Sequence, residues 1–168
     1  MEDSLLSNLY EPKEGLLYEL YRCEADELWS FVGNKGNKQW VWLVMNTANR
    51  QIIAFHVGGR SEADAKALFN KVPAVFRENA TFFTDFWQSY NFLEPEKHIA
   101  AGKEKGYTNH IERFNNTIRQ RCSRLVRKTL AFSNGATTRK LENHIGAIKY
   151  FICHYNKYLA KLIVEKNN

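Results

Sequence analysis

Three segments in the first part of the chain have the alternation of apolar and polar residues that is typical of β-strands. Tyr, Leu, Trp and Phe are interleaved with acidic residues over residues 17–32. Trp and Val dominate residues 39–46, and Ile, Phe and Val dominate residues 51–57. Gly and Asn at 33–38, and an Asn-Arg pair before the third segment, provide turns. This pattern predicts a three-stranded antiparallel meander.

Helical periodicity begins after these strands. Ser61 is a predicted N-cap, because it precedes an acidic first turn, and Pro73 is expected to end the helix. The elements predicted next are, in order, a strand at 80–84, a short helix or loop up to Leu93, a short strand at 98–101, a helix at 108–125 and a helix at about 135–160. Strands and helices mixed in this order indicate an α/β layered domain.

Charge is distributed unevenly along the chain. The formal net charge is +6, yet residues 1–30 hold eight acidic residues against two basic ones. Residues 97–140 hold eleven Lys and Arg against two Glu. A basic segment with so few acids is typical of a surface that binds phosphates, whereas a solvated helix face usually alternates in sign. We therefore expect a polyanionic partner.

Composition excludes several classes of protein. Three cysteines, an odd number at wide spacing, exclude a disulfide framework and a Cys-x-x-Cys zinc site. The apolar runs are too short to cross a membrane, and the acidic N-terminal segment does not resemble a signal peptide. We therefore expect a cytoplasmic protein. Residues 1–15 are expected to form a linker or flexible arm, and residues 16–168 one domain.

Candidate functional carboxylates lie at the ends of predicted elements. Glu24 and Asp26 share one face of the first strand and Glu27 lies on the other, but periodicity does not choose between Glu24 and Asp26. Asp85 follows an apolar strand, where it is equally well explained as a helix N-cap. Glu112 lies in the first turn of a basic helix, where the helix dipole also favours a surface glutamate.

Together, these acids indicate a metal site. Two acids on a sheet and one on a helix could hold two divalent cations such as Mg²⁺, which prefer carboxylate oxygens. Two such ions activate a nucleophile and stabilise the leaving oxygen in phosphoryl displacement. The basic residues that follow would hold a nucleic-acid backbone. They are Arg113, Arg119, Arg121, Arg124, Arg127 and Lys128.

Three stretches resemble the catalytic blocks of the DDE transposases. They are residues 24–33 (EADELWSFVG), 84–90 (TDFWQSY) and 107–115 (YTNHIERFN). The similarity is to the insertion-sequence-one family, and specifically to its InsB-type catalytic chain. Residues 119–125 (RQRCSRL) and 127–133 (RKTLAFS) also resemble that family. The resemblance covers about residues 17–155.

The resemblance implies a catalytic, metal-binding triad of Asp26, Asp85 and Glu112, and so favours Asp26 over Glu24. It implies a ribonuclease-H-like fold, in which a mixed five-stranded sheet is flanked by helices, with a C-terminal helical extension. It also implies two Mg²⁺ ions, or Mn²⁺ in their place. The expected reaction is cleavage at the ends of an insertion element and transfer of the 3′ hydroxyl into target DNA. Trp87, beside Asp85, is a further candidate DNA contact.

Partners and alternatives follow from the same resemblance. Active members are expected to be homo-oligomers that act on DNA at the nucleoid. An upstream module with a zinc-binding cysteine cluster and a helix-turn-helix is expected for recognition of the element ends and is not visible in this chain. The alternatives are a non-catalytic DNA-binding chain and a truncated regulatory subunit of a fused transposase. His98 and His110 could contact phosphate or shape the site, and their roles stay open.

Overall fold

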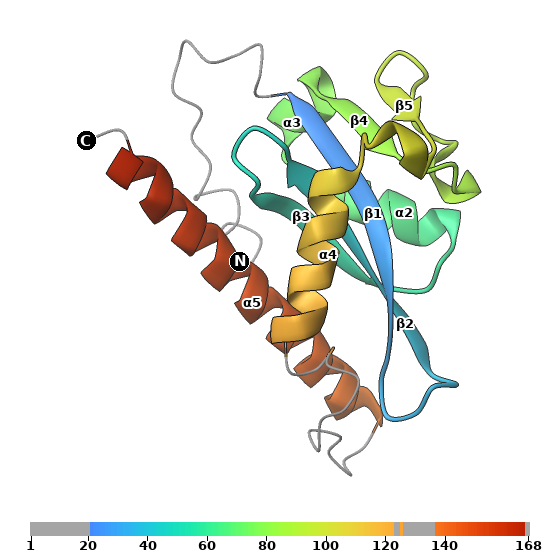
Figure 1. The fold of residues 1–168 in the computed structure, drawn as a ribbon. Helices are drawn as coiled ribbons and strands as arrows, with labels where there is room; N and C mark the ends of the chain where they lie inside the picture. Colours follow the sequence, from blue (N-terminus) through green and yellow to red (C-terminus); the bar gives the residue numbers. More distant parts are fainter. Residues whose placement is uncertain (1–20, 123–124, 126–136, 167–168) are drawn as a thin grey trace.

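The computed structural model describes residues 21–122, residue 125 and residues 137–166 (Figure 1). Its centre is a five-stranded sheet with the strand order β3-β2-β1-β4-β5. β1, β2 and β3 are antiparallel neighbours, whereas β4 is parallel to β1 and β5 is parallel to β4. The strands are β1 (Arg22–Phe31), β2 (Lys38–Asn46), β3 (Ile52–Gly58), β4 (Thr81–Thr84) and β5 (His98–Ala100). The described strands thus form the mixed five-stranded sheet that was predicted.

The β-meander forms where the alternating pattern predicts it. In the turn between β1 and β2, Gly33 has a φ of 78°, a left-handed conformation that glycine adopts without strain. The Oδ1 atom of Asn34 accepts hydrogen bonds from the backbone N–H groups of Gly36 and Asn37, which closes the turn. The expected linker at 1–15 lies outside the described residues.

Two helices, α2 (Glu62–Asn70) and α3 (Ala74–Asn79), connect β3 to β4. Ser61 caps α2 as predicted, in a capping box: its hydroxyl accepts from the N–H of Asp64, and the Asp64 carboxylate accepts from the N–H of Ser61. α3 is not among the predicted elements. Pro73 follows the end of α2 but also occupies the N-cap of α3, a position where its missing N–H costs no helical hydrogen bond.

Helices cover both faces of the sheet (Figure 1), and a hydrophobic cluster lies between the helices and each face. One lies against α2, α3 and the 3₁₀ turn η1 (Gln88–Tyr90), and includes Trp42 and Phe69. The other lies against α4 (Asn109–Arg121) and α5 (Thr137–Lys166), and includes Ile111 and Ile152. β1 contributes Ala25 to the first cluster and Leu28 to the second, so successive residues of β1 face opposite layers.

The C-terminal helix α5 is joined to the edge strand β3 by a side-chain amide. Asn156 accepts a hydrogen bond from the N–H of Ile52 at 3.0 Å and donates one to the Ile52 carbonyl at 2.8 Å. The amide therefore pairs with the strand backbone as a neighbouring strand would. The helix predicted at 108–125 ends earlier, at Arg121, where Cys122 is extended.

These elements confirm the predicted fold class, a ribonuclease-H-like mixed sheet between helical layers with a helical C-terminal extension. The strand order and directions carry this conclusion, because a parallel β4 follows three antiparallel strands and lies beside β1. Within the described residues, no helix combines the length and the apolar character needed to span a bilayer.

Candidate active site

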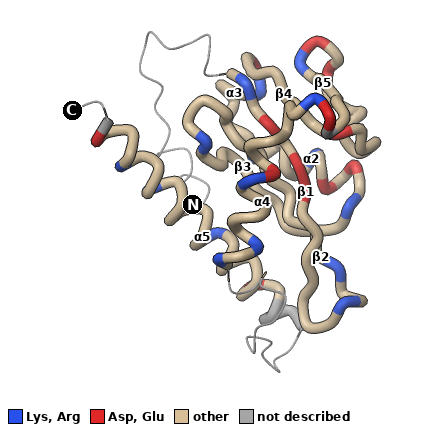
Figure 2. Tube along the Cα trace, in the orientation of Figure 1, with Lys and Arg blue, Asp and Glu red and all other residues tan. Residues whose placement is uncertain are grey.

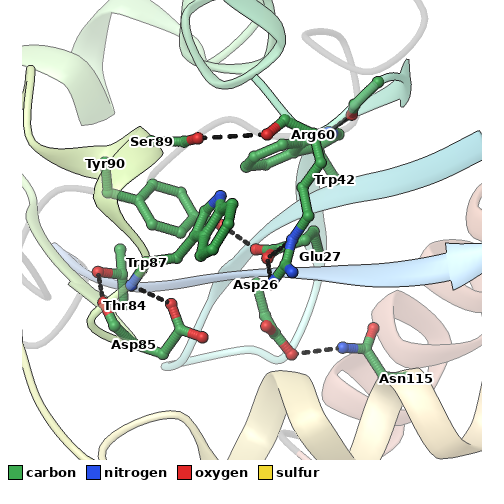
Figure 3. A network of polar contacts seen from close by, with 11 residues as sticks. Asp26, Glu27, Trp42, Arg60, Thr84, Asp85, Trp87, Ser89, Tyr90 and Asn115 are labelled. Carbon is green, nitrogen blue, oxygen red and sulfur yellow. Dashed lines mark hydrogen bonds and ion pairs between the residues drawn. The ribbon is translucent and has the colours of Figure 1, made fainter. Parts of the chain in front are cut away.

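Asp26 lies in the middle of β1, on the face that α4 covers. Its Oδ2 atom accepts a hydrogen bond from the side-chain Nδ2 of Asn115 on α4 at 2.7 Å (Figure 3). Burial raises the pKa of Asp26 from 3.8 to about 7, and the nearby charges of Glu27, Asp85 and Glu112 add to the shift. The carboxylate of Asp26 therefore lies in a negative environment that would favour a bound cation.

Asp85 follows the C-terminal end of β4, directly beside β1. The last parallel pair of the two strands is Glu24 with Phe83, so Asp26 and Asp85 each come two residues later. Asp85 Oδ1 accepts a hydrogen bond from the N–H of Trp87 at 2.9 Å, which fixes the tight turn after the strand. Asp85 is not a helix N-cap, because η1 begins at Gln88 and Trp87 occupies the cap position.

Glu112 lies in the first turn of α4, as predicted. One of its oxygens, Oε1, accepts a hydrogen bond from the hydroxyl of Thr108 at 2.9 Å. Asn115 and Arg119 follow one and two turns later on the same helix face. α4 therefore presents an acid, an amide and a guanidinium toward the face of β1 that holds Asp26.

Glu24 has a different role from Asp26, although both face α4. Its Oε2 atom accepts hydrogen bonds from the backbone N–H groups of His110 at 2.9 Å and Ile111 at 2.8 Å. Thr108, the N-cap residue, makes no side-chain capping bond, so Glu24 satisfies N–H groups that would otherwise be unpaired. Glu24 thus anchors the N-terminus of α4, whereas Asp26 lines the pocket.

A pocket of about 260 Å³ unites the predicted triad. Its lining residues are Asp26, Glu27, Arg60, Asp85, Glu112, Asn115, Asn116 and Arg119. Four carboxylates thus meet two guanidinium groups, and nearly all the lining is polar. Figure 2 shows α4, with its Lys and Arg positions, alongside the acidic positions of β1.

The donor set of this pocket fits a divalent cation in charge and in atom type. The Oδ1 atom of Asn115 is buried without a hydrogen-bond partner, and amide oxygens are ligands that Mg²⁺ accepts. Within residues 21–122, 125 and 137–166, no three His, Cys, Asp or Glu side chains are already gathered tightly enough to surround one ion. Asp26, Asp85 and Glu112 therefore share a pocket without forming a closed ligand cage.

Arg60 and Glu27 belong to this pocket, and neither was predicted as a site residue. Arg60 donates from Nε and Nη2 to Glu27 Oε1 at 2.9 and 2.6 Å (Figure 3). Glu27 faces away from α4, as its strand position predicts, yet it still lines the pocket. No spacing in the sequence connects the two residues, because the connection between β3 and α2 brings Arg60 to β1 only in the folded chain.

The predicted DNA-binding residues are distributed differently. Arg113 and Arg121 are exposed on α4, and Arg119 lines the pocket. Trp87 is half-buried, with its ring against the Arg60 guanidinium. The remaining three, Arg124, Arg127 and Lys128, lie outside the described residues.

His98 and His110, whose roles the sequence leaves open, lie at the border of the site. His98 Nε2 is 2.8 Å from the hydroxyl of Thr84, the residue before Asp85, and burial lowers the pKa of His98. His110 Nε2 is 4.0 Å from Glu24 Oε1. Burial, followed by the charge of Arg50, lowers the pKa of His110. Neither histidine lines the pocket.

Comparison with known proteins identifies the family. A model of the family described as IS1 transposase matches residues 20–156. The chain therefore belongs to the IS1 transposase family, and it holds the catalytic domain of a DDE-type polynucleotidyl transferase.

Individual relatives match over most of their length. The protein InsB of insertion element iso-IS1n from Shigella dysenteriae is 37% identical over 132 residues, which cover 77% of this chain and 92% of that protein. The IS1 protein InsB of Shigella flexneri is 32% identical, covering 77% and 96% respectively. Among solved structures, the HTLV-2 integrase catalytic core domain in complex with magnesium (trimeric form) is 15% identical with a TM-score of 0.47, covering 78% of this chain and 85% of that one. Family membership is carried by the sequence matches.

Proposed function

We propose that Asp26, Asp85 and Glu112 are the catalytic, metal-binding residues with which this transposase domain cleaves DNA at insertion-element ends and joins the freed 3′ hydroxyl to target DNA. The observation that carries the proposal is their convergence. Three acids that lie 59 and 27 positions apart in the sequence line one polar pocket. A chance surface distribution of acids would not bring all three to one pocket beside two arginines.

The metal of the proposed site is Mg²⁺, with Mn²⁺ as its substitute, and two ions are proposed. Asp26 and Asp85 would hold them from the sheet and Glu112 from α4, with the amide oxygen of Asn115 as a neutral ligand. When bound, such ions activate the attacking oxygen and stabilise the leaving oxygen of a phosphodiester.

The remaining lining residues orient the substrate and the acids. Asn115 holds the Asp26 carboxylate by its amide N–H, and Thr108 holds that of Glu112 by its hydroxyl. Arg119 lies on the same side of the pocket as Glu112 and would bind the DNA backbone close to the reacting phosphate. Asp85 is restrained by the N–H of Trp87 through Oδ1 alone, and its Oδ2 makes no bond recorded among the described residues.

DNA is the proposed substrate and partner, bound along the basic segment that begins on α4. Exposed Arg113 and Arg121 would contact phosphates on either side of the cleaved one. The proposed extension of this track is formed by Arg124, Arg127 and Lys128, with Trp87 as a further contact. A homo-oligomer, an upstream end-reading module and action at the nucleoid in the cytoplasm belong to the same proposal.

The test is nicking of supercoiled DNA that carries element ends, with the chain fused to an end-binding module. Asp85→Ala should abolish nicking in Mg²⁺ and Mn²⁺ while leaving DNA binding intact. Glu94→Gln is the matched control, because the side chain of Glu94 is 72% exposed and lies outside the pocket. Equal nicking by wild type and Asp85→Ala, or none by either, would favour a non-catalytic DNA-binding chain.

A further inference from the structure

Arg60 is held more rigidly than an ordinary surface arginine. Its guanidinium carbon lies 4.3 Å from the ring centre of Trp40 and 3.8 Å from that of Trp87. Its Nε and Nη2 atoms donate to one oxygen of Glu27. The two indoles and the carboxylate therefore fix the plane and the direction of the guanidinium.

The acid that holds Arg60 is itself part of a buried network. The Glu27 side chain is only 1% exposed, and its second oxygen accepts a hydrogen bond from the hydroxyl of the fully buried Tyr90 at 3.0 Å. A buried carboxylate is costly unless it is paired and hydrogen-bonded. The network is thus built into the core, whereas the Arg60 side chain remains 34% exposed at the pocket.

One edge of the guanidinium stays open. Arginine has five N–H donors, and the bonds to Glu27 use those on Nε and one on Nη2. Among the described residues, no hydrogen bond from Nη1 is recorded. Figure 3 shows Arg60 reaching toward Asp26 from the connection between β3 and α2, across the pocket from Asn115 on α4.

The acidic charge of the pocket indicates which group this open edge of Arg60 could bind. A phosphodiester that enters the pocket meets Asp26, Glu27, Asp85 and Glu112, all of which repel it unless cations are present. Arg119 provides N–H donors from α4, and Arg60 provides them from the opposite layer. A phosphate between these layers would thus find a donor on each side, in the planar geometry that suits its oxygens.

We propose that Arg60 is a substrate-binding residue that holds a non-bridging phosphate oxygen of the DNA strand beside Asp26, with Glu27, Trp40 and Trp87 acting to position its guanidinium. The proposal rests on the proposed function for its substrate, DNA. It goes beyond the triad because it assigns a phosphate contact to the layer that does not contain α4.

The experiment is a binding cycle on DNA in which single phosphates near the cleavage position are neutralised, one at a time, as methylphosphonates. Binding is measured in Ca²⁺, which also binds carboxylate oxygens, and a denaturing gel confirms that the DNA is intact, so cleavage does not enter. Wild type should lose about tenfold or more in affinity when the contacted phosphate is neutralised, since a charge-assisted hydrogen bond is removed. Arg60→Gln should bind unmodified DNA about as weakly, and neutralising that same phosphate should weaken it less than threefold further.

Two further variants separate phosphate binding from folding. Arg60→Gln leaves the Glu27 carboxylate buried without its cation, so the double variant Glu27→Gln/Arg60→Gln is measured beside it as an uncharged pair. Arg77→Gln is the matched control, because Arg77 is exposed on α3 and lies outside this pocket. If Arg60 had only a structural role, replacing it would weaken the binding of every DNA, whichever phosphate is neutralised, by the same factor.

The outcomes are decisive in both directions. The coupling is the loss of affinity that neutralising one phosphate causes in wild type but not after Arg60 is replaced. If this coupling is absent in both Arg60 variants, and Arg77→Gln behaves as wild type, the proposal is supported. Coupling that survives in folded Arg60 variants overturns it, as does a folded wild type that binds no DNA. A wild type that binds with this coupling but never cleaves in Mg²⁺ would refute the proposed catalysis and leave the Arg60 contact standing.

Discussion

The carboxylate of Glu24 on β1 accepts a hydrogen bond from the backbone N–H of Ile111 on α4, 87 residues later, at 2.8 Å. Its Oε2 atom also accepts from the preceding N–H, so a strand residue satisfies the first turn of a helix. Glu112 is the next residue of that helix. The position of one proposed catalytic acid therefore depends on an acid outside the proposed triad.

Removal of Glu24 should destabilise the fold. Glu24→Ala leaves two N–H groups without their acceptor in a buried position, and we expect the free energy of unfolding to fall by about 2 kcal/mol. Glu24→Gln keeps an acceptor oxygen and should cost less. Urea denaturation measures both, with exposed Glu94→Ala as the control. A Glu24→Ala protein as stable as wild type would contradict the anchoring role.

Asp26 should make the metal-free protein less stable as pH rises. Its folded pKa of about 7 is above the ordinary value of 3.8, so the folded state holds its proton more tightly than the unfolded state. The resulting stabilisation is complete below about pH 4 and is lost as pH rises through about 7. Asp26→Asn keeps a neutral side chain, so at pH 8 in EDTA it should be more stable than wild type by about 4 kcal/mol.

Thermal unfolding of wild type and Asp26→Asn between pH 4 and 8 tests whether wild type loses stability relative to the variant as pH rises. The difference between them isolates Asp26 from the other buried acids, since both proteins contain those. Mg²⁺ should stabilise wild type more at pH 8 than at pH 5, because a cation competes with the proton, and should have little effect on Asp26→Asn. A difference between the variants that does not change with pH would refute the raised pKa.

The strands could be predicted from the sequence because their alternating pattern is local. The placement of Glu24 and Asp26 on one face follows from the same period of two, and the structure confirms it. What each acid does could not be predicted from this period, because it depends on where the N-terminus of α4 lies in space; only the family resemblance favoured Asp26. α3 was missed because Pro73 was interpreted only as the end of one helix, although it also begins the next.

The role of Arg60 was beyond sequence analysis for a related reason. Its surroundings come from three separate elements: Glu27 on β1, Trp40 on β2 and Trp87 after β4. The indole of Trp87 was interpreted as a DNA contact because it is close to Asp85 in sequence. In the structure its ring lies against a guanidinium, and whether it also touches DNA stays a prediction.

Asn156 should be needed to hold α5 against β3. Asn156→Ala removes both hydrogen bonds to Ile52 and leaves a buried N–H and carbonyl unpaired, so we expect about 2–3 kcal/mol of destabilisation. Hydrogen exchange at Ile52 should speed up more than exchange at buried positions of β1. Asn143→Ala, exposed on the same helix, is the control. Unchanged exchange at Ile52 would show that α5 is held by apolar contacts alone.

Replacing the arginines on α4 should have two different effects, one on DNA binding and one on DNA cleavage. Arg113 and Arg121 are exposed outside the pocket, so replacing either with Ala should weaken binding of any sequence and reduce the salt dependence by about one counterion. Arg119 lines the pocket beside Glu112, so Arg119→Ala should mainly lower the rate of cleavage at saturating DNA. Binding across a salt series and single-turnover cleavage measure the two effects separately. If Arg119→Ala changes only the salt slope, as Arg113→Ala should, then the pocket contact does not act on the reacting phosphate.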